Sequence, residues 1–435
     1  HEAETLDDLE YVNITDLLVQ DVQVYGAVGF SIMEETAYVI RAKAVLVATG
    51  GAAGLYKPNN PGFSRHKMWY PPFNTGAGYA MGILAGAEMT SFEMRFIALR
   101  CKDTIAPTGT IAQGVGAKQI NAAGEIYETK YGLTTSERVY GTVRENQLGH
   151  GPCYLKTTGI TKEQDEDLLK AYLNMAPSQT LKWIESGKNP SEQDVEIQGT
   201  EPYIVGGHTA SGYWVNTGRE TTVKGLYAAG DVAGGCPQKY VTGALAEGKL
   251  AALDMVKQFS AGSLKEADIT TEAEIKVQEE KILSQYEKFR NEDAPAFSVE
   301  ELEEAMQKIM DQYAGGIGTD YRYSGMSLAK ADEKIAALLP VVDTLAATDT
   351  YELMQIYELR ERLIVCQAVI AHLAARKETR WHSFGENTDY PQQSEEWMKY
   401  VNSRMENGEI KILYRDLITK ENTGLNTAEK GAGER

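Results

Sequence analysis

Two short apolar segments that end in paired glycines place the strongest constraint on how this chain can fold. Residues 44–51 read AVLVATGG, and residues 225–235 read GLYAAGDVAGG. Each has the length of a buried parallel strand followed by a tight turn, and glycine there lets the backbone approach a cofactor closely. Either segment alone is a weak signal. In this order, and with a long insertion between them, they predict a Rossmann-like nucleotide-binding domain built from two separate parts of the chain.

The residues around these strand ends are the candidate cofactor site. Asp231 follows the second strand directly, where its carboxylate can accept a hydrogen bond from a ribityl or ribose hydroxyl. A helix starting near Thr242 would direct its N-terminus at the pyrimidine end of a flavin. We therefore expect FAD to be bound by Thr49, Gly50, Gly51, Gly230, Asp231, Thr242 and Leu245.

The phosphate-binding half of such a site is not found in the sequence. No G-x-G-x-x-G stretch follows an opening strand, since Gly114 and Gly116 lack the third glycine. The chain instead opens with strands expected over 24–32 and 37–49, which is typical of the middle of a nucleotide-binding domain. We expect an N-terminal portion upstream of His1 to supply the missing half.

Length and periodicity predict an α+β protein of several domains, because 435 residues exceed one hydrophobic core. The expected domains are a first part of the FAD-binding domain (1–91), an inserted capping domain (92–203), a return segment of the FAD-binding domain (204–258) and a C-terminal helical domain with a polar tail (259–435).

Helices are expected within this plan wherever apolar residues recur at three- and four-residue spacing. The clearest cover 75–90, 162–185 and 351–376. The last 35 residues or so are expected to be irregular, with a mobile tail over 421–435.

The net charge and the cysteine content narrow the range of functions and partners that this chain can have. A net charge of −19 argues against nucleic acid or an anionic membrane surface as partner. The four cysteines are far apart and form no iron–sulfur or other metal motif, so no metal site is expected and a reducing cytoplasmic setting fits best. No apolar run is long enough for direct membrane insertion. An anionic substrate would require positive charge concentrated in a cleft.

Several longer motifs occur in an order that resembles one enzyme family. They are WYPPFNTGAGYAMGILAGAEMTSFEMRFIALRCKD (69–103), EPYIVGGHTASG (201–212), AGDVAGG (229–235) and HLAARKETRW (372–381). From about residue 40 to 420 the chain resembles the flavoprotein subunits of the fumarate reductase, succinate dehydrogenase and L-aspartate oxidase family. In detail it is most similar to the alpha subunits of adenylylsulfate (APS) reductases.

The resemblance assigns roles to individual residues. It implies substrate binding by Trp69, Arg100, Gly109 and Lys239, and catalytic roles for Arg100, Arg138 and His208. These residue types suit the chemistry, because arginine offers a fork of charged donors to an oxyanion and histidine can donate or carry a proton near neutral pH. Two alternatives stay open for Arg138: it could pair with Glu137 or Glu145 at the surface, or Arg144 could take its role.

The resemblance also implies an activity and partners. The expected reaction interconverts adenylylsulfate with AMP and sulfite through a flavin N5–sulfite adduct, with electrons delivered by an iron–sulfur beta subunit in a heterodimer. One alternative is a fumarate-reductase-like enzyme, although this chain has Pro202 and Lys239 where those enzymes carry histidine and arginine. Against the APS reading, Thr110 to Gln113 form a more polar wall than that pattern has. A non-catalytic fragment is the other alternative.

Overall fold

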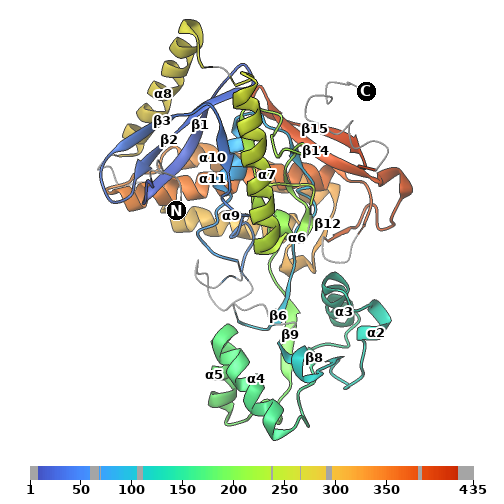
Figure 1. The fold of residues 1–435 in the computed structure, drawn as a ribbon. Coiled ribbons are helices and arrows are strands. Elements are labelled where there is room, and N and C mark those ends of the chain that lie inside the picture. The colour runs from blue at the N-terminus through green and yellow to red at the C-terminus, as the bar shows by residue number, and fades with distance from the viewer. Residues whose placement is uncertain are drawn as a thin grey trace.

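The computed structural model describes residues 8–58, 68, 70–104, 111–236, 239–264, 266–290, 296–380 and 385–419. Trp69 and Gly109, two of the predicted substrate-binding residues, lie outside these ranges, as does the predicted tail over 421–435. The described residues form a large upper body and a smaller lower lobe, joined by the segments that contain β6 (Leu99–Cys101) and β9 (Val195–Gly199) (Figure 1). No helix among them is both long and apolar enough to cross a membrane.

The N-terminal part forms a three-stranded antiparallel sheet of β1 (Val12–Gln20), β2 (Gln23–Ser31) and β3 (Ala37–Arg41). The strand expected over 37–49 is divided. Its first half is β3, and its second half, β4 (Val45–Val47), leaves this sheet and pairs in parallel with β11 (Leu226–Ala228). The chain crosses between the two sheets at residues 42–44, and this crossing delivers β4 to the nucleotide-binding region.

The connection from β4 into the upper body contains α1 (Ala77–Leu84), which covers only half of the helix expected over 75–90. Gly76, with φ of 88°, provides the left-handed turn that precedes the helix. Gly82 lies so close to Tyr213 that a Cβ there would be 2.2 Å from the phenol oxygen. The small residues of this segment therefore allow close packing against β10 (Gly212–Tyr213).

The last 35 residues are not all irregular, so that prediction was wrong. β14 (Lys399–Glu406) and β15 (Glu409–Asp416) form an antiparallel hairpin. They extend a four-stranded sheet in the order β10-β5-β14-β15, where β5 is Met89–Thr90. Exposure alternates along much of β15, whereas β14 buries Val401, Asn402 and Ser403 in succession.

The lower lobe has a four-stranded antiparallel sheet and a core of its own. The strand order is β6-β9-β8-β7, with β7 at Gln119–Ile120 and β8 at Cys153–Leu155. Its helices are α2 (Glu128–Tyr131), α3 (Thr135–Gln147), α4 (Lys162–Met175) and α5 (Pro177–Ser186), with the 3-10 turn η1 (Ala112–Val115). Tyr172 and Trp183 are fully buried within this core.

The C-terminal helices are α8 (Ile269–Phe289), α9 (Val299–Tyr313), α10 (Gly325–Val342) and α11 (Thr350–Ala375). Short elements complete this part: η3 (Ile317–Thr319), β12 (Arg322–Tyr323), β13 (Glu386–Asn387) and η4 (Glu395–Trp397). α11 is buried along most of its length, which fits the long helix expected over 351–376.

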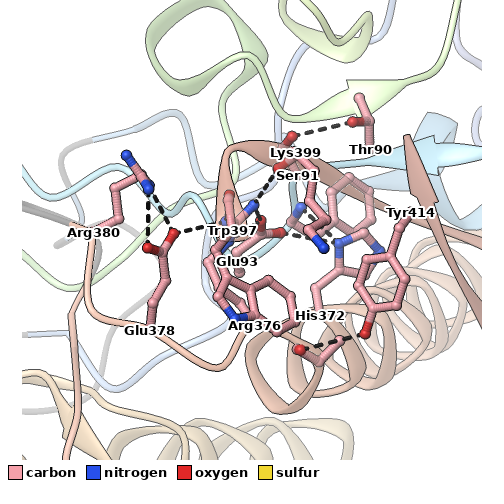
Figure 2. A network of polar contacts seen from close by, with 12 residues as sticks. Thr90, Ser91, Glu93, His372, Arg376, Glu378, Arg380, Trp397, Lys399 and Tyr414 are labelled. Atoms are coloured by element: carbon pink, nitrogen blue, oxygen red, sulfur yellow. Dashed lines mark hydrogen bonds and ion pairs between the residues drawn. The ribbon is translucent and has the colours of Figure 1, made fainter. Parts of the chain in front are cut away.

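A buried polar network holds the carboxyl end of α11 against the β14 segment (Figure 2). Arg376 donates from Nε to Glu93 at 2.8 Å and from one terminal nitrogen to Glu378 at 3.0 Å. His372 Nε2 lies 2.7 Å from Ser403 Oγ. Burial alone would raise the pKa of Glu93, but Arg376 and His372 hold it below its usual value. The charges in this network are therefore compensated by one another.

Candidate functional site

The two glycine-rich strand ends meet at one edge of the β4–β11 pair. Because these strands run in parallel, with Val47 opposite Ala228, the residues that follow them emerge side by side. Gly50 and Gly230 adopt φ of 78° and 77°, conformations that other residues rarely take. A Cβ on Gly51 would be only 2.5 Å from the Ile204 carbonyl oxygen. The sequence prediction that residues 49–51 and 230–231 come together is therefore reproduced by the fold.

Tyr70 links these two strand ends through its hydroxyl group. The Gly51 backbone N–H donates to the phenol oxygen at 3.1 Å, and the phenol donates to Asp231 Oδ2 at 2.9 Å. Burial, together with the nearby Asp231 charge, raises the pKa of Tyr70, so the phenol stays neutral and can donate. Tyr79 anchors the same loop by donating to the Asp231 carbonyl oxygen at 2.7 Å.

His208 lies next to Asp231 on the short helix α6 (Gly206–Thr209). The preceding residue, Gly207, has to be glycine, because a Cβ there would be 1.9 Å from Asp231 Oδ1. The imidazole ring packs on Phe96 at a centroid distance of 4.2 Å. Burial lowers the pKa of His208, with Asp231 opposing the shift. The ring is therefore mainly neutral at pH 7, suited to hydrogen bonding rather than to carrying a charge.

Lys239 lies directly before α7 (Tyr240–Ser260) and is buried. Its ammonium group donates to the carbonyl oxygen of Gly230 at 2.8 Å and lies 3.1 Å from Glu247. Glu247 in turn accepts from the Gly230 backbone N–H at 2.9 Å. Lys239 thus braces the loop that carries Asp231, and its predicted contact with substrate stays a prediction.

Arg100 is a second buried cation, besides Lys239. Its side chain is fully buried on β6, 3.3 Å from Glu201, which is also buried. Within the described part of the chain, Nε and both terminal nitrogens of Arg100 make no hydrogen bond. A buried guanidinium normally satisfies its donors, so an unsatisfied one indicates a place for an anionic ligand.

A short chain of contacts leads from Arg100 to the glycine-rich edge. The Tyr203 hydroxyl donates to Glu201, and the Tyr203 ring lies 6.1 Å from that of Tyr70. Tyr70 then reaches Asp231, as described above. Side-chain contacts therefore connect the predicted anion-binding arginine with the predicted cofactor residues.

Arg138 is placed differently from these residues. It lies on α3 in the lower lobe, where it pairs with Glu128 at 3.1 Å and donates to the Leu133 carbonyl oxygen at 2.9 Å (Figure 1). Its partner is thus neither Glu137 nor Glu145. None of its contacts with the described residues reaches Arg100 or His208, and its catalytic role stays a prediction. Thr242 and Leu245 lie on an exposed face of α7.

The sequence interpretation missed three residues that the structure places in the site, namely Tyr70, Glu201 and Tyr203. All three stand inside motifs that were already recognised, since Tyr70 follows Trp69, and Glu201 and Tyr203 flank Pro202. They could have been identified as polar or aromatic residues that stand next to a predicted site residue in the sequence. Their pairing could not have been found, because it depends on segments far apart in the chain.

These residues suit the flavin end of FAD. Gly50, Gly51 and Gly230 bring no side chains to this edge, and the Asp231 carboxylate has the chemistry to accept from a ribityl hydroxyl, so its contact with FAD stays a prediction. The sequence contains no G-x-G-x-x-G stretch, so the usual donors for the pyrophosphate are not among these residues.

Comparisons with known proteins identify the family of this chain. The "FAD binding domain" family matches residues 2–244, and the "Fumarate reductase flavoprotein C-term" family matches residues 303–429. Adenylylsulfate reductase subunit alpha of Megalodesulfovibrio gigas is 29% identical, over 88% of this chain and 66% of its own length. The chain thus spans just under two thirds of that relative.

Solved structures give the same result. Adenylylsulfate reductase from Archaeoglobus fulgidus has a TM-score of 0.85 and 33% identity, over 94% of this chain and 72% of its own. A structure of adenosine-5-phosphosulfate reductase with sulfite as a covalent adduct has a TM-score of 0.84 and 32% identity, over the same shares. The chain therefore belongs to the FAD-binding flavoproteins of the fumarate reductase family.

Proposed function

We propose that this chain is the flavin-binding part of an oxidoreductase that interconverts adenylylsulfate with AMP and sulfite. The observation that carries the proposal is Arg100, a fully buried guanidinium without hydrogen bonds to the described residues, connected through Glu201, Tyr203 and Tyr70 to the FAD edge. Its geometry suits a sulfur or phosphorus oxyanion held beside the flavin. The similarity to adenylylsulfate reductases, one of them bound to sulfite, supports the same substrate class.

Each residue has a distinct part in this proposal. FAD, when bound, supplies the two-electron chemistry. Arg100 binds the oxyanion and stabilises the charge that builds up as the S–O bond to the AMP phosphate breaks. Neutral His208 donates a hydrogen bond at the same site. Asp231 and the Gly51 N–H, both held by Tyr70, orient the flavin end of the cofactor.

We also propose an iron–sulfur beta subunit as the electron-transfer partner, in a cytoplasmic heterodimer. The support is that Cys101, Cys153, Cys236 and Cys366 are too far apart in sequence to form a cluster motif. A separate iron–sulfur subunit would supply the electron carrier that these residues do not form.

The test is a steady-state assay of the purified holoenzyme with ferricyanide as electron acceptor. We expect ferricyanide reduction only when both AMP and sulfite are present, with loss of activity in Arg100→Gln. The exposed Arg404, paired with Glu406 on β14, offers a matched control as Arg404→Gln. Oxidation of reduced viologen by fumarate, without any reaction that depends on AMP and sulfite, would support the fumarate-reductase-like alternative and overturn the proposal. FAD binding without turnover of either substrate would support a non-catalytic role.

A further inference from the structure

The sheet of the lower lobe has one apolar and one polar face along the β6–β9 pair (Figure 1). Leu99, Cys101 and Ile197 point to the apolar face and belong to the buried core of the lobe. Successive residues of a strand point to opposite faces, so Arg100 and Gln198 point to the polar face. Their side chains therefore lie outside the apolar core of the lobe.

The polar face carries two cross-strand pairs that differ in their chemistry. Lys102 donates to Glu196 at 2.9 Å, so a donor there meets an acceptor. Arg100 lies directly opposite Gln198, which places their Cβ atoms about 4.5–5.5 Å apart. The Nε2 atom of Gln198 and the three nitrogens of Arg100 are all buried, and none makes a hydrogen bond to a residue that the structure describes. The first pair is complete, whereas the second consists of two donors.

Two buried donors side by side require an acceptor, because a buried N–H group without one is costly. Glu201 lies 3.3 Å from one terminal nitrogen of Arg100, so it occupies only part of the guanidinium. An anion that binds the rest of the guanidinium brings its oxygens next to Gln198, since the two side chains emerge from facing positions. The strand pair thus presents one charged donor group and one neutral donor group to the same ligand.

We propose that Gln198 is a second oxyanion-binding residue, which donates from Nε2 to an oxygen that Arg100 does not reach. An arginine fork binds two oxygens of an anion. A carboxylate has no further oxygen, whereas the sulfur of sulfite or of adenylylsulfate carries a third that Gln198 can bind. Gln198 thereby makes the site prefer sulfur oxyanions to carboxylates. This inference rests on the proposed function only in taking Arg100 as the residue that binds the substrate anion.

The test compares methanesulfonate with acetate, two monoanions that carry the same methyl group but differ by one oxygen. Binding of each anion to the purified holoenzyme is measured from the broadening of its methyl proton signal in NMR titrations. We expect wild type to bind methanesulfonate about 10- to 100-fold more tightly than acetate, which is the factor that one hydrogen bond to a charged group provides.

Gln198→Met removes the donor and keeps a side chain of similar length. We expect its affinity for methanesulfonate to fall about 10- to 100-fold, while its affinity for acetate stays within about threefold of wild type. Gln193→Met is the matched control, because Gln193 is exposed in the loop before β9, where its side chain accepts from Ser186 at 3.0 Å. The control should bind both anions like wild type.

Gln198→Glu provides a second variant, in which a carboxylate of the same size faces Arg100. The added negative charge should weaken the binding of both anions by about tenfold or more. Retained FAD and an unchanged melting temperature show that each variant is folded. Should Gln198→Met not fold, Gln198→Glu decides, and methanesulfonate binding at wild-type strength in that variant would overturn the inference.

Three further results would also overturn it: unchanged methanesulfonate binding in Gln198→Met, an equal loss for both anions in that variant, or a wild-type protein that binds neither anion. These results are distinct from failure of the proposed function. A preference for methanesulfonate that Gln198→Met abolishes, in an enzyme that does not oxidise sulfite with AMP, would keep the inference and remove the substrate assignment. AMP-dependent sulfite oxidation with an unchanged KM for sulfite in Gln198→Met would do the reverse.

Discussion

Two buried arginines of this chain have nearly the same exposure but opposite surroundings. Arg376, at the end of α11, donates to the carboxylates of Glu93 and Glu378 and to the carbonyl oxygens of Trp397 and Lys399 at 2.8 to 3.0 Å (Figure 2). Arg100, on β6, has one ion pair at 3.3 Å, and none of its nitrogens makes a hydrogen bond to the described residues. Burial alone therefore does not tell a structural arginine from a ligand-binding one, whereas the satisfaction of its donors does.

The difference has a physical reason. A buried charge is tolerated when hydrogen bonds and a counterion replace the lost water, and Arg376 has both. Among the described residues Arg100 has only the counterion, so part of its desolvation is not compensated by them. We expect substitutions at Arg376 to act on stability and substitutions at Arg100 to act on ligand binding and rate.

The largest expected effect is on stability, in Arg376→Met. Loss of the guanidinium leaves Glu93 buried without its main partner and removes one donor from Glu378, which keeps Arg380, so the free energy of unfolding should fall by about 3–5 kcal/mol. Urea denaturation of the holoenzyme, followed by tryptophan fluorescence, measures it. The exposed Arg404→Met should cost less than about 1 kcal/mol. Equal costs in the two variants would contradict the structural role given to Arg376.

The second-largest effect is expected on the catalytic rate of the Arg100→Lys variant. Lysine keeps the positive charge but loses the fork of donors, so kcat for AMP-dependent sulfite oxidation should fall about 10²–10³-fold. The free energy of unfolding should change much less than in Arg376→Met, because no hydrogen bond within the described residues is lost. A variant with wild-type kcat but strongly reduced stability would reverse the distinction between the two arginines.

A smaller effect, on FAD affinity, is expected for Tyr70→Phe at the glycine-rich strand ends. The substitution removes the hydrogen bonds to Gly51 and Asp231 and leaves both groups less well oriented. FAD should bind about 5–30-fold more weakly, which corresponds to about 1–2 kcal/mol. Flavin fluorescence during reconstitution of the deflavinated protein measures it, with the exposed Tyr414→Phe as control. Tighter FAD binding in Tyr70→Phe would mean that the tyrosine competes with the cofactor.

Part of the fold and of the candidate site could be predicted from the sequence. The glycine pairs at 50–51 and 234–235, with the long helix near 351–376, indicated the FAD-binding fold, because their periodicity and turn chemistry are local. The division of residues 37–49 between two sheets was missed, since an apolar run does not reveal its pairing partner. The β14–β15 hairpin was missed because its polar positions look like loop. Partners of buried charges, such as Glu201 for Arg100, are set by tertiary structure and leave no spacing signal.

The smallest expected effect is a pH dependence of stability that arises at His208. Burial lowers the pKa of this imidazole below its ordinary value near 6.5, so below pH 6.5 the unfolded chain binds a proton that the folded protein resists. The stabilising contribution of neutral His208 is thus complete above pH 6.5 and is lost as the pH falls towards the lowered folded-state value. His208→Gln cannot titrate, so its melting temperature should fall less than that of wild type between pH 7.5 and 5.5. The extra loss of unfolding free energy in wild type, relative to His208→Gln, should stay below about 1 kcal/mol over this pH range, because the ring is partly exposed. Differential scanning calorimetry across this range provides the measurement. Parallel slopes for the two proteins would mean that His208 is protonated as easily in the folded protein as in water, and its assignment as a neutral donor beside the flavin would then have to be abandoned.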